Sequence, residues 1–422
     1  MNELVRNKSQ RRFVFISTCP EAWGGSEELW SGAAVSFAEK RHSVSVFKTV
    51  VDKAHPTVQR LKSLSCKVRD LQRIRVAQRF VDLLLPARYQ LTPIRKQLLL
   101  LGCYLVARRP DLAIISQGDN YDGIHLGYLC RRLKQPYVII SQKATDHFWP
   151  RDEAREKMRQ VFESARECFF VSNHNRRLTE DQIGMELANA AIVRNPFLVA
   201  HGHPLTWPDQ AQGFRLACVG RLFLLDKGQD ILLRVLARRK WQCRNLSVSF
   251  FGQGVNREGL DDLARKLGVS NVTFAGQTRD VPGIWKDHHA LIMPSRCEGL
   301  PLSLVESMLS GRLAIATNVG GNGEIIEDNI NGFLAAAATE ADIDEALERA
   351  WERRGEWREI GQLAATRIRE LVPANPASEF ADRLMEIASK LSGPLSLTPF
   401  GWGRERESTD ELERAAKLTA LD

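Results

Sequence analysis

Short apolar runs rich in β-branched residues alternate with longer segments of helical period along most of the chain. The runs that we predict as strands are residues 12–18, 42–50, 111–116, 136–141, 167–172, 191–196, 214–220, 246–254, 271–277, 289–295 and 312–318. Helical periods occupy residues 26–40, 227–239, 257–268 and 301–311, among others. Strands that alternate with helices across short connections predict parallel sheets with both faces covered, which is an α/β fold.

Chain length and a break in the pattern predict two domains. A chain of 422 residues is longer than a single core usually supports. Residues 195–213 have no helical period and contain three prolines, as is typical of a linker. We therefore expect two Rossmann-like domains that face each other across a cleft, over residues 1–196 and 197–374, and assign no fold to the tail at 396–422.

Composition agrees with an ordinary globular protein, since 26% of the residues are charged and 44% are hydrophobic. The apolar run at residues 98–106 is too short to cross a bilayer, and the basic N-terminal residues do not resemble a signal peptide. We expect a cytoplasmic protein. The eight cysteines form no CxxC pair, so we predict reduced core thiols and no metal site.

The net charge of +8 arises in one region. Residues 60–109 contain twelve Lys or Arg and only two Asp. Interleaved with apolar residues, this window could meet an anionic membrane surface, which would make the protein peripheral at the inner membrane face, or bind an anionic acceptor. Solvated helices with Arg-rich faces are an equally good interpretation. Nothing in the sequence predicts binding to nucleic acid.

The most informative segment is residues 289–311, HALIMPSRCEGLPLSLVESMLSG. We predict a strand that ends near Pro294, a loop that carries Glu298, and a helix with Pro301 in its first turn and Glu306 further along. A diphosphate suits the free N–H groups at such a helix start, and the carboxylates suit sugar and ribose hydroxyls. Alternatively, Glu298 is a solvated loop acid, and Ser303 with Glu306 forms a capping box.

Two cations follow the strand at 214–220. Arg221 comes directly after its glycine, and Lys227 with Gly228 is expected to open the next helix. Two fixed cations can neutralise a leaving diphosphate without a metal ion, although both could be surface charges beside a turn. Gly320 and Gly321 similarly follow a strand, where their backbone could approach a ligand.

Gly24 and Gly25 lie between the first strand and the first helix, where Ser26 could cap the helix. The loop has neither the GxGxxG pattern of dinucleotide-binding proteins nor the lysine of a P-loop. A dehydrogenase is therefore disfavoured.

The segments VGRL…KGQD, FFGQG, PSRCEGLPLSLVESMLSG and VGGNGEIIEDNINGFL occur in order between about residues 214 and 335. Together they resemble the C-terminal signature of family-4 retaining glycosyltransferases, which have the GT-B fold. The Glu-x7-Glu element from Glu298 to Glu306 is the most specific part, and the Gly24–Gly25 loop agrees with the family's first loop.

The resemblance implies transfer of a sugar from a nucleotide-sugar donor to a glycan, lipid-linked or small-molecule acceptor. It implies retained anomeric configuration, no cofactor and no divalent metal. It also implies that residues 375–395 return to the first domain. The roles that it implies are diphosphate neutralisation for Arg221 and Lys227, sugar contact for Glu298, ribose contact for Glu306, amide contacts from Gly299, Leu300 and Leu302, and the phosphate side of the cleft for Gly24 and Gly25.

One position departs from the family pattern. Many members have a histidine near the acceptor just after the strand that here is residues 136–141, whereas this chain has Gln142 and reaches His147 five residues later. Either His147 takes the catalytic role from the loop or the role is absent. Thr145 and Asp146 are further candidates for acceptor contacts.

Other classes remain open from the sequence alone. A non-catalytic nucleotide-sugar-binding protein would bind a donor without turning it over. A GT-B epimerase or phosphorylase would share the fold but carry out different chemistry.

Overall fold

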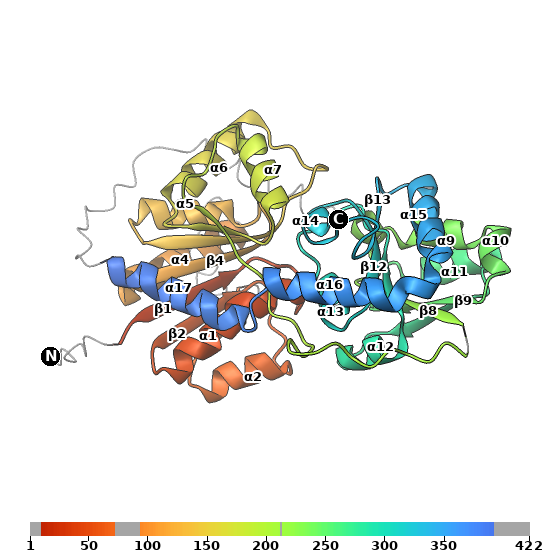
Figure 1. The fold of residues 1–422 in the computed structure, drawn as a ribbon. Helices are drawn as coiled ribbons and strands as arrows, with labels where there is room; N and C mark the ends of the chain where they lie inside the picture. The colour runs from red at the N-terminus through yellow and green to blue at the C-terminus, as the bar shows by residue number, and fades with distance from the viewer. Residues whose placement is uncertain (1–9, 72–92, 212, 392–422) are drawn as a thin grey trace.

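The computed structural model describes residues 10–71, 93–211 and 213–391, and two parallel sheets with their helices lie side by side in it (Figure 1). The tail at 396–422 lies outside the described residues. So do Arg73, Arg75, Arg79 and Arg88 of the basic window. The α/β architecture with two Rossmann-like units that the hydrophobic pattern predicts is confirmed.

The first sheet has seven parallel strands in the order β3-β2-β1-β4-β5-β6-β7. Its strands are β1 (Arg12–Ser17), β2 (Ser43–Lys48), β3 (Lys67–Asp70), β4 (Leu112–Asp119), β5 (Tyr137–Lys143), β6 (Cys168–Phe170) and β7 (Ala190–Ile192). The helices between them are α1 (Glu28–Glu39), α2 (Pro56–Ser63), α4 (Pro93–Arg108), α5 (Ile124–Arg132), α6 (Asp152–Ser164) and α7 (Asn173–Ile183), with a short 3-10 turn at Gly25–Glu27 before α1.

The second sheet has six parallel strands in the order β10-β9-β8-β11-β12-β13. Its strands are β8 (Phe214–Val219), β9 (Leu246–Phe251), β10 (Val272–Gly276), β11 (Ala290–Met293), β12 (Leu313–Thr317) and β13 (Phe333–Ala335). Its helices are α8 (Leu224–Lys227), α9 (Gln229–Leu236), α10 (Arg239–Gln242), α11 (Arg257–Leu267), α12 (Val281–Asp287), α13 (Leu302–Leu309), α14 (Asn322–Ile325), α15 (Glu340–Glu352) and α16 (Trp357–Leu371). The last described helix is α17 (Pro376–Lys390).

Continuous apolar runs form the central strands because both faces of each sheet are buried. Along β1, Phe13 and Phe15 pack with α1 and α17 on one face, whereas Val14 and Ile16 pack toward α4, α5 and α6 on the other. Strand β4 pairs with β1 in parallel, with Leu112 opposite Phe13. Alternate side chains of this one strand thus belong to two hydrophobic cores, one on each face of the sheet.

The hydrophobic pattern did not predict two of the edge strands, β3 and β13. Strand β3 has the sequence KVRD and is half-exposed, and β13 has only three residues. An edge strand can be short and polar because only one neighbour pairs with it. Strand β3 therefore carries no apolar run, and β13, although its three residues are apolar, is shorter than the runs on which the strand predictions depended.

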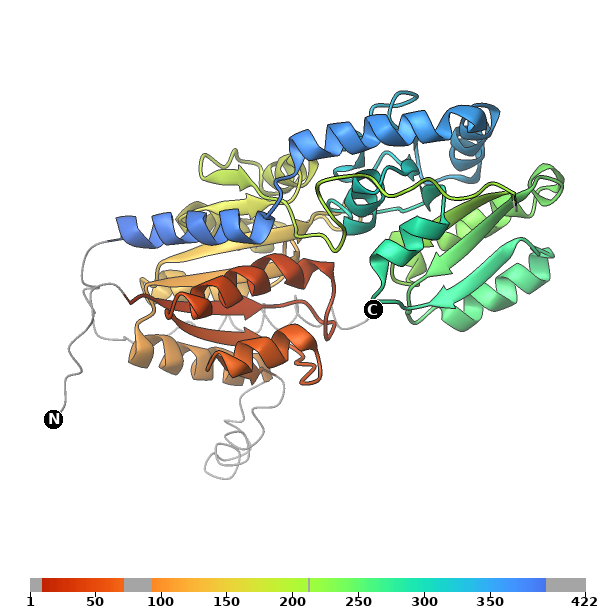
Figure 2. The same ribbon diagram turned by 60° about the horizontal axis from the view of Figure 1, so that its bottom comes forward.

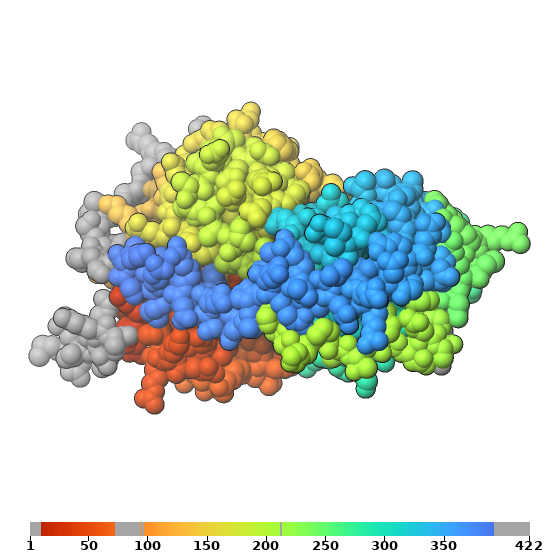
Figure 3. Space-filling model, in the orientation of Figure 1, coloured from red at the N-terminus to blue at the C-terminus, as the bar shows by residue number. Residues whose placement is uncertain are grey.

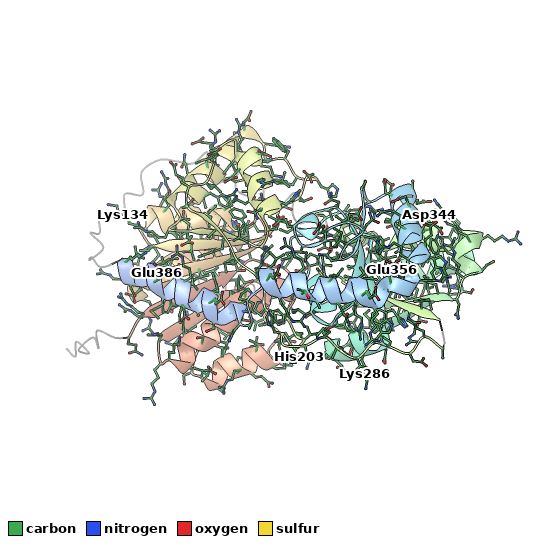
Figure 4. The ribbon with its side chains drawn as sticks, in the orientation of Figure 1. Lys134, His203, Lys286, Asp344, Glu356 and Glu386 are labelled. Atoms are coloured by element: carbon green, nitrogen blue, oxygen red, sulfur yellow. The ribbon has the colours of Figure 1, made fainter. Side chains whose placement is uncertain are left out.

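The C-terminal helices cross from one domain to the other. Helix α16 packs on α13 of the second domain, while Phe380, Ala381 and Leu384 of α17 join the core of the first. Helix α17 can approach α1 this closely only because residue 32 of α1 is a glycine. A Cβ on Gly32 would lie 2.6 Å from the Cβ of Ala377. Figure 3 shows these helices spread over both domains, and Figure 4 shows Glu356 over the second and Glu386 over the first.

The described residues between β7 and β8 contain no helix or strand, and they run along α16 in Figure 2. Arg369 Nε donates to the carbonyl of His201 over 2.6 Å. The guanidinium of Arg312 is buried and donates to the carbonyls of Leu205 and Thr206 over 3.3 and 2.6 Å. The linker is thereby fixed to the second domain.

Six of the eight cysteines are buried free thiols, as expected, but Cys103 and Cys243 are exposed. The prediction of core thiols is therefore wrong for one cysteine in each domain. Among the described residues, no helix is both long and apolar enough to span a bilayer.

The packing of α17 leads to a stability prediction. Leu384 is fully buried, so Leu384→Ala should lower the free energy of unfolding by about 2–4 kcal/mol, because it leaves a cavity between α17 and α1. Urea unfolding followed by circular dichroism measures this loss. Leu363→Ala, on an exposed position of α16, is the matched control and should change stability by less than about 0.5 kcal/mol. Equal losses in the two variants would contradict the contribution of α17.

Candidate active site

The strand order reverses once in each sheet, between β1 and β4 in the first and between β8 and β11 in the second. In open parallel sheets, ligands bind beyond the carboxyl ends of the strands at such a reversal. The loops that follow these strands meet here, because Glu21 after β1 forms an ion pair with Arg221 after β8. The candidate site therefore lies where the two reversal points face each other.

Arg221 follows β8 and its side chain is 48% exposed. Besides Glu21, its guanidinium pairs with Asp226, with Nη2 3.4 Å from Oδ2. Its backbone carbonyl accepts a hydrogen bond from Gln229 Nε2 over 2.7 Å. One cation of the predicted pair is thus at the carboxyl edge of the second sheet.

Lys227 lies in the same site, but not at the start of a helix as expected. It ends the short helix α8, and Gly228 then adopts a φ of +62° before α9 begins. A Cβ on Gly228 would lie 2.1 Å from the carbonyl oxygen of Pro294. The helix is interrupted at Gly228, because the backbone just after β11 lies too close to this position for any side chain.

Glu298 is 4% exposed and is therefore not a solvated loop acid. Its Oε1 accepts hydrogen bonds from Lys227 Nζ over 2.6 Å and from Ser295 Oγ over 2.7 Å. A charge-assisted pair in a buried setting holds both side chains in one geometry. The structure thus brings a predicted cation and a predicted carboxylate into direct contact.

Helix α13 begins at Leu302, one residue later than expected, because Pro301 takes the N-cap position with extended backbone angles. No side chain caps this end, so the first backbone N–H groups of α13 remain available. Ser303 is already inside the helix and cannot form a capping box with Glu306. The capping alternative is therefore wrong.

Glu306 is 4% exposed, and its Oε1 accepts a hydrogen bond from the backbone N–H of Leu198 over 2.9 Å. Burial, with a smaller contribution from the nearby charge of Glu28 in the first domain, raises the pKa of Glu306 to about 7 against the lowering effect of the Leu198 bond. This carboxyl connects α13, the linker and the first domain.

The Gly24–Gly25 loop approaches the same helix. A Cβ on Gly25 would lie 2.8 Å from Leu302 Cδ1 of α13. The residue at the N-cap of α1 is Glu27, and Ser26 Oγ instead lies 3.3 Å from Cys19 Sγ. The expectation that Ser26 caps α1 is wrong, because the 3-10 turn at Gly25–Glu27 moves the start of α1.

Three further glycines allow backbones to meet. A Cβ on Gly299 would lie 2.0 Å from the carbonyl oxygen of Gln142, and one on Gly320 would lie 2.2 Å from that of Glu298. The N–H of Gly321 donates to the carbonyl of Gly299 over 2.6 Å. Leu300 is buried in the core of the second domain. The loop around Glu298 is thus pressed between the first domain and the β12–α14 loop.

Gln142 is buried and fully engaged on the first-domain side. Its Nε2 donates to the carbonyl of Ser26 over 3.2 Å, and its Oε1 accepts from Asn195 Nδ2 over 2.7 Å. Thr145 is also buried, whereas the side chains of Asp146 and His147 are exposed on the loop after β5. The backbone N–H of His147 donates to Thr145 Oγ1 over 3.2 Å. Gln142 therefore connects the glycine loop to the linker.

Sequence reasoning missed Lys143, whose Nζ lies 3.2 Å from Asp119 Oδ1 and 3.0 Å from Asp226 Oδ2. Burial alone would lower the pKa of Lys143, but the charges of Asp119 and Asp226 outweigh burial and raise it. Asp119 and Lys143 are the last residues of β4 and β5. Charged residues that end two neighbouring strands were the signal that could have identified them.

A further missed pair supports the glycine loop. Lys48 Nζ donates to the carbonyls of Cys19 and Glu21 over 3.3 and 2.6 Å and lies 3.5 Å from Glu27 Oε2. Lys48 and Glu27 are both buried, and desolvation raises the pKa of Glu27 although Lys48 opposes this effect. In the part of the chain that the structure describes, no cluster of three His, Cys, Asp or Glu side chains could hold a metal ion.

Glu306 makes the stability of the protein depend on pH. Its pKa rises from 4.5 to about 7 on folding, so the folded protein keeps a proton that the unfolded chain loses, and stability falls as the pH rises through this range. Glu306→Gln retains an acceptor for the Leu198 N–H but does not titrate. Relative to wild type, the variant should gain about 2–3 kcal/mol between about pH 4.5 and about pH 8 in urea unfolding experiments.

The control for this prediction is Glu359→Gln, at an exposed position of α16. Its stability relative to wild type should be the same at both pH values. If the free energy of unfolding of Glu306→Gln differs from that of wild type by the same amount at both pH values, Glu306 does not titrate in this range.

Residues 213–353 match the family described as glycosyl transferases group 1. A putative glycosyltransferase, EpsD of Bacillus subtilis (strain 168), is 30% identical over 159 residues, which are 37% of this chain and 42% of that protein. A glycogen synthase of Pseudomonas syringae pv. syringae (strain B728a) is 29% identical over 260 residues, covering 58% of this chain and 52% of that enzyme. The matches thus span about half of these relatives or less.

Solved structures resemble the chain over most of its length. Anabaena HepE in complex with UDP-glucose superposes with a TM-score of 0.70 at 17% identity, over 89% of this chain and 100% of HepE. Sucrose-phosphate synthase from Thermosynechococcus elongatus gives a TM-score of 0.69 at 16% identity, over 90% of this chain and 99% of that enzyme. At these identities the likeness establishes the fold. The chain therefore has the GT-B fold, and its residues 213–353 are similar to the glycosyl transferases group 1 family, in the region where its motifs occur.

Proposed function

We propose that the chain is a retaining glycosyltransferase that moves a sugar from a nucleotide-sugar donor to an acceptor hydroxyl without a divalent metal. One observation carries the proposal: at the strand-order reversal of the second sheet, Lys227 binds the buried carboxylate of Glu298, and Arg221 and the uncapped start of α13 follow the neighbouring strands β8 and β11. The similarity to a putative glycosyltransferase and to a glycogen synthase supports it, as do the HepE structures with UDP and with UDP-glucose.

The donor diphosphate would bind between the two cations and the amides of the α13 loop, namely those of Gly299, Leu300 and Leu302. Free N–H groups and the positive end of a helix favour a phosphate there. A diphosphate would give Lys227 a second anionic partner, so that Glu298 could accept hydrogen bonds from sugar hydroxyls. Glu306 would contact the ribose. A ribose hydroxyl can donate a hydrogen bond to the carboxyl group of Glu306 whether that group is protonated or ionised.

The proposed chemistry is a front-face displacement. A bond forms between the acceptor oxygen and the anomeric carbon while the bond from that carbon to the leaving phosphate oxygen breaks, and the acceptor proton moves to a phosphate oxygen. Arg221 and Lys227 stabilise the charge that develops on the leaving diphosphate. Gly24 and Gly25 would line the phosphate side, and Gln142, Thr145, Asp146 and His147 the acceptor side.

Removing either cation should therefore abolish most turnover. Arg221→Ala and Lys227→Ala should each lower kcat by about 10²–10³-fold, because each removes a charge aimed at the leaving group. Nucleotide release is measured with the donor that most stabilises the wild-type protein in a thermal-shift screen of UDP, GDP, ADP and their sugars. A saturating donor at about 100 Kd should add about 2.7 kcal/mol to the stability of the folded state.

Lys266→Ala is the matched control, since this exposed lysine lies at the C-terminal end of α11, and its kcat should equal that of wild type. EDTA should leave wild-type turnover unchanged. Unaltered turnover in both cation variants would refute the assignment. Donor binding without release for any acceptor would favour a nucleotide-sugar-binding protein instead.

We also propose that the enzyme is cytoplasmic and docks peripherally on an anionic membrane surface through α4, which would bring it to a lipid-linked acceptor. Leu99, Cys103 and Val106 are exposed at helical spacing on this helix, and Arg108 and Arg109 are exposed at its end. Apolar side chains beside cations are typical of surfaces that enter the lipid headgroup region.

Reversing the two terminal charges should weaken this docking. Arg108→Glu combined with Arg109→Glu should reduce co-sedimentation with phosphatidylserine vesicles at least about tenfold, since each cation near an anionic surface contributes about 1 kcal/mol. Arg239→Glu, an exposed arginine of the second domain, should leave binding unchanged. Equal binding of the wild-type protein to neutral and anionic vesicles would contradict an electrostatic role.

A further inference from the structure

Five charged side chains form a continuous chain of alternating sign that starts in the first domain, passes through the second and returns to the first. In order they are Asp119, Lys143, Asp226, Arg221 and Glu21. Lys143 Nζ lies 3.2 Å from Asp119 and 3.0 Å from Asp226, and Arg221 pairs with Asp226 at 3.4 Å and with Glu21. Two links, Lys143–Asp226 and Arg221–Glu21, join the domains.

Asp226 is the central member of this chain. Its side chain is only 10% exposed. Its backbone carbonyl accepts hydrogen bonds from the N–H groups of Arg296 and Cys297 over 2.7 and 3.1 Å. The carboxylate that receives Lys143 is thus held in a fixed position relative to the loop that carries Glu298.

Lys143 is fixed just as firmly on the first-domain side. It pairs with Asp119 across the register of β4 and β5, and its side chain is 20% exposed. An ion pair in such a half-buried position is screened less by salt than a surface pair. Its two carboxylates come from different domains, so Lys143 holds both only while the domains are in contact.

We propose that Lys143 and Asp226 form an ionic latch between the two domains, and that the latch positions Arg221 by bringing Glu21 against it. Both are positioning residues rather than catalytic residues. The role of Arg221 as a diphosphate ligand rests on the proposed function, whereas the latch itself does not.

The arrangement of charges makes the latch reversible. When the domains separate, Lys143 keeps Asp119 and Asp226 keeps Arg221, so neither charge is left without a partner. Leaving a buried ion without any partner is strongly destabilising. Because Lys143 and Asp226 each keep one partner within their own domain, separation of the domains does not incur this cost. Opening therefore breaks the two links between the domains while the two links within them remain.

Two native thiols allow a direct test without new labelling sites. Cys103 and Cys243 are the exposed cysteines, and they lie on α4 of the first domain and at the end of α10 of the second. Spin labels on both, measured by double electron–electron resonance in the full chain, report the distance between the domains. The wild-type distribution should be narrow at low salt and should gain a longer component as salt rises from about 0.05 to about 1 M, where the Debye length is roughly 3 Å.

Lys143→Met and Asp226→Asn should each produce the longer component at low salt, and the double variant should be no wider than either single variant. Lys143→Arg restores the charge and should restore the narrow distribution, which a purely steric role would not predict. Asp230→Asn is the matched control, because Asp230 pairs with Arg296 in the same loop, over 2.8 Å, but within one domain. Its distribution should equal that of wild type.

The latch would be overturned if both single variants had the same spin-label distance distribution as wild type. It would also be overturned if the broadening in the double variant were the sum of that in the two single variants. Titration with UDP separates this outcome from the proposed function. Lys143→Met should still bind UDP, because it removes none of the proposed donor ligands, but it should bind UDP more weakly than wild type, because Glu21 no longer positions Arg221. Absence of UDP binding in wild type and variants would count against UDP as the donor nucleotide without changing the distance measurement that decides the latch.

Discussion

The structure depends on one geometric constraint: the strands of each sheet are parallel, so their carboxyl ends lie along a single edge. Helices cover both faces of each sheet, and loops with polar side chains can collect mainly at that edge. Because the strand order reverses at β1/β4 and at β8/β11, the loops diverge there and leave room for side chains such as Glu21 and Arg221. Placing the two edges opposite each other brings both sets of loops into one site.

Close backbone contact is the second feature that shapes this site. Gly299 meets the carbonyl of Gln142, Gly320 meets that of Glu298, and Gly228 meets that of Pro294, each at a distance that no Cβ permits. The first contact joins the two domains, and the other two hold the loops that carry Glu298 and Lys227 together within the second domain. Glu298 and Glu306 are both buried beside these contacts. Burial in turn raises the pKa of Glu306, so tight packing has a direct electrostatic consequence for a residue that we expect to meet the donor.

Charged groups inside the molecule are held by several partners each. Lys48 donates to two carbonyls and faces Glu27, and Arg312 donates to the carbonyls of the linker. Such groups are stable because their hydrogen bonds replace those lost with water. They fix the glycine loop and the linker, and the position of the site relative to both domains follows from them.

The sequence by itself determined the α/β class and every strand except β3 and β13. It also determined the segments that carry Arg221, Lys227, Glu298 and Glu306. Period and length suffice for this, since a run buried on both faces must be apolar throughout. It did not reveal β3, which is polar, or β13, which has only three residues. It misplaced the starts of α1, α9 and α13, because a 3-10 turn precedes α1, Pro301 takes the N-cap of α13, and the backbone of Pro294 lies against Gly228 before α9. Only the tertiary structure decided that Lys143 meets Asp226 and that Gln142 touches Gly299. These pairs are more than eighty residues apart in the chain, and only the packing of one domain against the other brings them together.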